Sequence, residues 1–203
     1  MPAWTFDCET YSIYDGKLGK RYTRTVGSGK NRRTVTEIRY FRIRGSKKIS
    51  FDDLIISAGK NISSAEIANI SPFKTNDSFE YDMKYLAGFS SEHYTLKLKT
   101  GWDSAKFKIN DNIRATILHS YNYDVVSYLN VNTTYNSIKY KYVLLPVWIG
   151  NYVYHKKIYR FIANGESGRM YGKTPISALK VTLVVLLVIA LVVAFMLFAG
   201  YSE

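Results

Sequence analysis

Eleven basic side chains gather in residues 20–48, and they are the strongest chemical feature of this 203-residue chain. The same segment holds a single acid, Glu37, so it supplies +10 of the formal net charge of +12. Guanidinium and ammonium groups at this density attract anions. The candidate contact residues are Lys20, Arg21, Arg24, Lys30, Arg32, Arg33, Arg39, Arg42, Arg44, Lys47 and Lys48.

Three classes of partner and one structural alternative account for this segment. Anionic lipid headgroups attract basic residues near a membrane surface. Nucleic-acid phosphates do the same, and the interleaved Tyr22, Tyr40 and Phe41 could stack on bases. An acidic protein surface is the third class of partner. The structural alternative is a solvated hairpin, in which charge protects an edge strand from pairing with another chain.

The tetrapeptide Gly27-Ser28-Gly29-Lys30 resembles part of a phosphate-binding loop. A Walker A motif needs a glycine five residues before the Gly-Lys pair and Ser or Thr after it. Those positions hold Arg24 and Asn31, so the residues indicate a hairpin turn.

Nucleophiles and metal ligands do not form a recognisable catalytic or metal-binding pattern. His93, His119 and His155 are far apart in the sequence and lack the spacing of a metalloprotease. Cys8 is the only cysteine, which excludes an intrachain disulfide and cysteine-rich zinc sites. It shares a strand face with Trp4 and Phe6, as expected for an inert, buried thiol.

The acidic residues and one glycine-containing loop have structural interpretations. Asp7, Glu9, Asp52 and Asp53 fit caps, turns and salt bridges better than catalytic carboxylates. The loop 164–168 is either an anion-binding loop or a plain β-turn. We therefore expect no enzymatic activity, no cofactor and no metal site.

The hydrophobic pattern predicts mostly strands, in agreement with 18 tyrosines. It predicts a strand over 2–11, a turn at 14–19 and a hairpin with arms 20–26 and 32–44. Ser63 and Glu66 form a capping box for a short helix that must end before Pro72. Apolar residues at three- and four-residue spacing predict a helix over about 101–121. Five further strands separated by turn residues suggest an antiparallel meander over 125–172.

The 20 residues from Val181 to Gly200 contain no charge. A helix of this length spans roughly 30 Å, the thickness of a bilayer's hydrocarbon core. This predicts a cytoplasmic domain over 1–175 and a membrane anchor over 176–203, with a transmembrane helix over 181–200. The expected fold class is α+β: a β-rich antiparallel sheet, one or two amphipathic helices and this C-terminal transmembrane helix. Lys173, Lys180 and Tyr201 are the expected membrane-interface residues.

The two ends of the chain predict its orientation. The first twenty residues lack a signal peptide's apolar region, and basic residues precede the span. The positive-inside rule then places the N-terminal domain in the cytoplasm, as in a tail-anchored, single-pass protein of the cell membrane. The alternative is that later spans have been removed.

Five stretches of the chain carry a resemblance to a protein family. They are residues 2–7 (PAWTFD), 51–55 (FDDLI), 85–89 (YLAGF), 142–148 (YVLLPVW) and 159–175. In them the chain resembles the membrane-bound C-terminal half of bacterial proteins with an N-terminal TFIIB-type zinc ribbon. The ribbon's CxxC pairs are absent here, so no zinc function is carried over. The resemblance implies stomatin-like (SPFH) membrane scaffold proteins as a partner class.

These observations together predict a non-enzymatic, membrane-anchored interaction or scaffold protein. We expect the lipid bilayer as one partner, and either a homo-oligomer or another membrane protein. The alternative is a membrane-associated nucleic-acid-binding protein that uses the basic hairpin.

Overall fold

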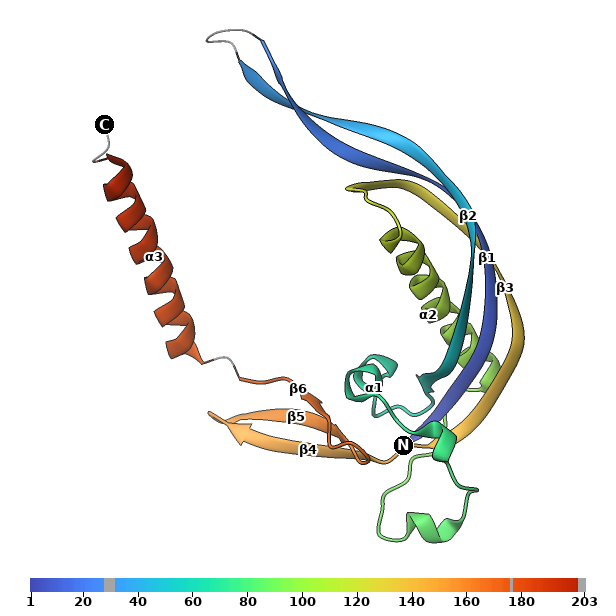
Figure 1. Cartoon of the computed structure of the whole chain (residues 1–203). Helices are drawn as coiled ribbons and strands as arrows, with labels where there is room; N and C mark the ends of the chain where they lie inside the picture. The colour runs from blue at the N-terminus through green and yellow to red at the C-terminus, as the bar shows by residue number, and fades with distance from the viewer. Residues whose placement is uncertain (28–31, 176, 201–203) are drawn as a thin grey trace.

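A computed structural model of the chain describes residues 1–27, 32–175 and 177–200. Its larger sheet contains three antiparallel strands in the order β2-β1-β3. They are β1 (Pro2–Val26), β2 (Arg33–Ser57) and β3 (Val125–Leu144). β1 is the central strand, and the sheet curves around helix α2 (Leu98–His119), as Figure 1 shows.

β1 and β2 continue beyond the end of β3. The register of β1 with β3 ends at the pair Gly19–Val125, whereas β1 stays paired with β2 as far as Val26 and Arg33. Residues 20–26 and 33–39 therefore form a two-stranded projection, which we call the basic arm. It extends from the body of the molecule at the top of Figure 1.

A second antiparallel sheet has the order β4-β5-β6. It comprises β4 (Val147–Tyr154), β5 (Lys157–Asn164) and β6 (Met170–Gly172). His155 and Lys156 join β4 to β5 with φ angles of 46° and 62°. Two consecutive left-handed residues are the signature of a type I′ turn, whose twist matches that of a β-hairpin.

The largest apolar core lies between α2 and the three-stranded sheet. α2 buries Ala105, Ile109, Ile113 and Ile117, which recur every four residues and so share one face of the helix. Ile109, Ile113 and Ile117 pack against a group of sheet residues from all three strands: Cys8, Leu18, Ile43 and Leu129. This core fixes α2 across the middle of the sheet.

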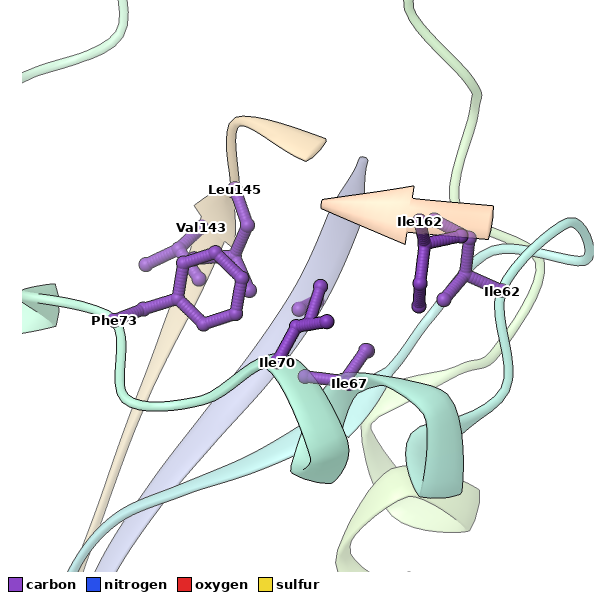
Figure 2. Close-up of a cluster of buried hydrophobic side chains, with 8 residues drawn as sticks. Ile62, Ile67, Ile70, Phe73, Val143, Leu145 and Ile162 are labelled. Carbon is purple, nitrogen blue, oxygen red and sulfur yellow. The ribbon is translucent and has the colours of Figure 1, made fainter. Parts of the chain in front are cut away.

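A smaller core joins the two sheets through α1 (Ser64–Ile70). Figure 2 shows Ile67 and Ile70 of α1 beside Val143 and Leu145, with Ile162 of β5 in the same cluster. The predicted capping box begins α1: Ser63 accepts from the N–H of Glu66, and Glu66 accepts from the N–H of Ser63. Two short 3₁₀ turns follow, at Thr75–Asp77 and Met83–Leu86.

The fold class predicted from the sequence, α+β with one β-rich sheet, is wrong. The described residues are mostly β, in two separate antiparallel sheets with three helices. The expected meander over 125–172 is divided, because β3 pairs with β1 and only β4, β5 and β6 form a meander. Ser137, at a φ of 53°, marks an irregularity inside β3 and not a turn between two strands.

The turn expected at residues 14–19 is also absent, because this stretch lies in the middle of β1. Its glycines allow close packing. A Cβ on Gly16 would lie 2.9 Å from the Tyr128 carbonyl oxygen, and one on Gly19 would lie 2.6 Å from Ile38 Cγ2. Glycine is therefore needed here for the approach of neighbouring groups, and the chain does not reverse direction.

The third helix, α3 (Ala178–Gly200), stands apart from both sheets in Figure 1. When only the residues that the structure describes are counted, no helix is long and apolar enough to cross a membrane. This finding contradicts the predicted transmembrane helix 181–200 and anchor 176–203, and with them the tail-anchored, single-pass location in the cell membrane with a cytoplasmic domain. Tyr201 lies outside the described residues.

Ile113 offers a test of the main core. Its side chain has no exposed surface, and it packs in the cluster that joins α2 to the sheet. We expect Ile113→Ala to lower the free energy of unfolding by about 2–5 kcal/mol, the usual cost of truncating a buried isoleucine. Urea denaturation measures this change. Phe107→Ala on the exposed side of α2 is the control, and an equal loss there would contradict the assignment of the core.

Glu66 makes a contribution to stability that depends on pH. Its carboxylate accepts from the backbone N–H and hydroxyl of Ser63, both at 2.8 Å, and lies 3.6 Å from the Arg160 guanidinium. The backbone hydrogen bond from Ser63 is the main cause that holds the pKa of Glu66 below its ordinary value of 4.5. A lowered folded-state pKa stabilises the fold above the ordinary value, and this contribution is lost as the pH falls through the lowered pKa.

We therefore expect Glu66→Gln to reduce stability by about 0.5–1 kcal/mol at neutral pH, since the group is partly exposed. Below the lowered pKa, the variant and the parent should be equally stable. Urea denaturation at the two pH values, with Glu80→Gln as the control, measures the difference. A deficit that does not change with pH would show that the charge of Glu66 is not responsible.

Candidate interaction surfaces

The predicted basic residues lie on and below the basic arm. Lys20, Arg21 and Arg24 belong to β1, and Arg32 immediately precedes β2. The other described residues lie along β2: Arg33, Arg39, Arg42, Arg44, Lys47 and Lys48. Lys30 lies outside the described residues. The structure therefore places ten of the candidates along one pair of strands.

The strand register divides these residues between two faces of the sheet. Even-numbered residues of β1 from Cys8 onward point to the side where α2 packs, which we call the α2 face. Cross-strand pairs share a face, so the α2 face carries Lys20 with Arg39, and Val26 with Arg33. Arg24 and Lys47 lie on the same face.

The opposite side, which we call the open face, carries the odd-numbered residues of β1 from Glu9 to Arg21 with their partners. The side chains from Glu9 to Asp15 are exposed there. Arg42 pairs with Lys17, Arg44 with Asp15, and Lys48 with Tyr11. The basic charge of this segment therefore lies on both sides of the strands.

Two ion pairs hold the arm at its base and along its length. The Lys20 ammonium lies 3.3 Å from the Asp124 carboxylate, and Arg24 lies 2.7 Å from Glu37. Asp124 also accepts the backbone N–H of Arg21 at 2.8 Å. This hydrogen bond, followed by the contacts with Lys20, lowers the pKa of Asp124 and keeps it ionised. Asp124 thus connects the arm to the turn after α2.

Most of the basic side chains have no acidic partner. Among the described residues, no carboxylate lies within 4.0 Å of the charged groups of Arg33, Arg39, Arg42, Arg44 or Lys47. Three cations of this region lie over tyrosine rings instead. Arg39 lies 5.0 Å from the Tyr22 ring centroid, Lys17 lies 5.0 Å from Tyr40, and Lys48 lies 5.9 Å from Tyr11. Such contacts orient a cation and leave its charge available to an anion.

Three carboxylates meet at the bulge where β1 and β2 change register. Ligand atoms of Asp7, Asp52 and Asp53 lie within 4.8 Å of one another, a spacing that could suit a divalent cation. Asp53 has a φ of 51°, and its backbone N–H donates to Asp7 Oδ1 at 2.9 Å. The bulge and this hydrogen bond explain why the carboxylates meet.

The remaining chemical candidates do not come together. Cys8 is buried, and burial is the main cause that raises its thiol pKa, which disfavours the nucleophilic thiolate. His93 lies before α2, His119 ends α2, and His155 forms the turn between β4 and β5. We find no nucleophile–base pair among these four residues.

The loop 164–168 is organised by the buried side chain of Asn164. Its amide donates to the carbonyl oxygens of Ile70 and Pro72, both at 2.9 Å. Its Oδ1 accepts the backbone N–H groups of Glu166 and Ser167, at 2.8 and 3.1 Å. These amide hydrogens are therefore already bonded within the protein, which favours a structural turn over an anion-binding loop.

A groove of about 660 Å³ lies between α1 and strands β5 and β6. Its lining includes Glu66, Asn69, Arg160, Tyr171 and Lys173. Arg160 spans part of it, since it donates to the Asn61 carbonyl oxygen at 2.6 Å and approaches Glu66. Lys173, which was expected at a membrane interface, borders this groove. Lys180, which was also expected there, lies in the first turn of α3.

Sequence reasoning missed one surface, the outer edge of β4. The strand reads VWIGNYVY and has no formal charge. Trp148, Ile149 and Val153 are 63%, 49% and 70% exposed. Phe89 contacts the Trp148 ring edge-on, with 6.2 Å between the centroids. The sequence shows a run of eight uncharged, β-prone residues here, which indicates a strand. Such a run does not distinguish an edge strand from a buried one.

Comparisons with known proteins give one distant similarity. No family model matches the chain, and no solved structure matches it. It is 26% identical over 186 residues to the uncharacterized protein YdjG of Bacillus subtilis (strain 168). The alignment covers 89% of this chain and 52% of the relative, so the chain spans about half the length of the curated relative it matches.

Proposed function

We propose that this chain is a non-enzymatic interaction or scaffold module whose basic arm binds an acidic protein surface. The observation that carries the proposal is the projection of β1 and β2 beyond β3, with Arg33 and Arg39 on its α2 face and Arg21 on its open face. No carboxylate of the described residues lies within 4.0 Å of these three guanidinium groups. A two-stranded arm can enter an acidic groove and present charge to both of its walls. Assembly with a second copy, or with a stomatin-like scaffold protein as the family resemblance implies, belongs to the same proposal.

The position of the arm supports a role in binding rather than in stability. Most arm side chains are exposed, and the buried clusters lie below the arm, where Leu18 and Ile43 contact α2. Like charges such as Lys17 and Arg42, just below the arm, stand opposite each other across the strands. Such pairs destabilise an isolated sheet, and a bound anion would relieve their repulsion.

Nucleic-acid binding is the second candidate, and the tyrosines favour it. Tyr22 and Tyr40 are each about half exposed, and aromatic rings beside arginines are typical of single-strand binding surfaces. Arg39 and Lys17 already lie over these rings, however. Each ring therefore has one side less available for a base, and we rank the acidic protein partner first.

Charge removal tests the arm together with the adjoining residues Arg32 and Arg42. We expect the combined variant Arg32→Gln, Arg33→Gln, Arg39→Gln, Arg42→Gln to bind a polyglutamate peptide about tenfold or more weakly, since each exposed charge contributes about 0.2–1 kcal/mol. Fluorescence anisotropy across a salt titration measures this affinity, and binding should weaken as salt increases.

The matched control removes four exposed lysines outside the arm: Lys60→Gln, Lys97→Gln, Lys99→Gln, Lys157→Gln. It has the same net charge as the arm variant. If net charge alone determined the affinity, both variants would bind polyglutamate equally weakly. That result would overturn the arm as the binding surface.

Tyr22→Leu and Tyr40→Leu separate the two candidate functions. If bases stack on these rings, each substitution should weaken binding of single-stranded DNA or RNA by about 1–3 kcal/mol. We expect a smaller loss, with polyglutamate bound at least as tightly as an oligonucleotide at equal salt. Oligonucleotide binding that is both tighter and dependent on tyrosine would establish the second candidate in place of the first.

A further inference from the structure

The two sheets expose four strand edges, and these edges differ in charge. β2 carries six basic residues along its length, and β3 carries Lys139 and Lys141. β6 has only three residues. β4 is an eight-residue edge strand without a charged side chain, and the described residues pair it only with β5. An uncharged, exposed edge strand is a ready template for pairing with another chain.

The side chains of β4 add apolar surface on both sides of that edge. Trp148, Tyr152 and Tyr154 lie on one side of the strand, and Ile149 and Val153 lie on the other. All five side chains are exposed. A partner strand at this edge would therefore gain backbone hydrogen bonds and apolar contacts on both faces of the sheet.

We propose that β4 is the self-association edge of this chain, where β4 of a second copy pairs with it in antiparallel orientation. The chain has a net charge of +12, of which residues 20–48 supply +10, so two copies repel each other most strongly where these basic residues face each other. Repulsion is weakest where neither strand carries charge. The same patch meets itself in a two-fold pairing, which is the commonest symmetry of homodimers.

The β4 sequence is complementary to itself in this orientation. With Asn151 on the two-fold axis, Ile149 lies opposite Val153 of the second copy, and Trp148 lies opposite Tyr154. With Gly150 on the axis, Trp148 lies opposite Tyr152, and Val147 lies opposite Val153. Both registers place aliphatic groups against aliphatic groups and rings against rings, which stabilises antiparallel pairs. The result would be a continuous six-stranded sheet formed from two copies of β4-β5-β6.

This inference rests on the proposed scaffold function: β4 is the surface of self-association, and a second copy of the chain is the partner. The test measures the mass of the full chain by sedimentation over a range of concentrations. Mild detergent is included, because α3 exposes apolar side chains such as Leu183 and Leu187. We expect a dimer for the parent chain and at least a tenfold weaker association for Ile149→Lys.

Ile13→Lys is the matched control. It makes the same substitution at an isoleucine of similar exposure, 54% against 49%, on the central strand of the other sheet. Circular dichroism establishes that both variants are folded. A monomeric parent chain would overturn the inference, and so would equal weakening by the two substitutions. If the Ile149→Lys variant still binds polyglutamate, the arm binds its partner without self-association at β4.

Cross-linking tests the geometry directly. Asn151→Cys should form a disulfide-linked dimer under mild oxidation in the register that places Asn151 on the two-fold axis, because a residue on that axis faces its own copy across the paired strands. Asn132→Cys on the open edge of β3 is the control and should stay monomeric. Equal cross-linking at both positions would indicate random collision and would overturn the β4 pairing.

Discussion

The pairing of β1 on both of its sides is the constraint on which the rest of the structure depends. β1 has 25 residues, and it aligns β2 on one side and β3 on the other. α2 packs on the surface that these three strands create, and its buried isoleucines contact residues from each of them. A side chain at Gly16 or Gly19 would collide with neighbouring groups, so the two glycines in β1 are part of this constraint. The arm exists because β2 follows β1 for longer than β3 does.

Local signals in the sequence predicted several elements well, because local chemistry determines them. The capping box of Ser63 and Glu66 needs only residues within one helical turn. The hairpin around residues 27–31 and the helix near 101–121 were indicated by turn residues and by four-residue spacing, and the described strands and α2 lie at these places. The alternation of Trp4, Phe6 and Cys8 likewise indicated side chains that pack in the clusters with α2.

Features that depend on distant residues were predicted poorly. Nothing within residues 14–19 shows that glycine there accommodates Tyr128 and Ile38, so the stretch resembled a turn. The division of the meander into two sheets depends on β1, more than a hundred residues earlier in the chain. The distribution of arginines over two faces depends on the register of β1 with β2, which composition does not reveal. The apolar run near the C-terminus led to a membrane assignment that the described helices contradict.

The length of the β1–β2 pair gives the arm mechanical properties that depend on direction. Inter-strand hydrogen bonds lie perpendicular to the strands. A force along the arm would load many of these bonds at once in shear, whereas a sideways force on one strand would open them one after another, as in a zipper. The bond between the N–H of Asp124 and the Gly19 carbonyl oxygen, at 2.8 Å, stands where the third strand begins. A force that reached this point would be distributed over three strands and the turn after α2. Asp124 is therefore the point at which the arm is fixed to the body of the molecule.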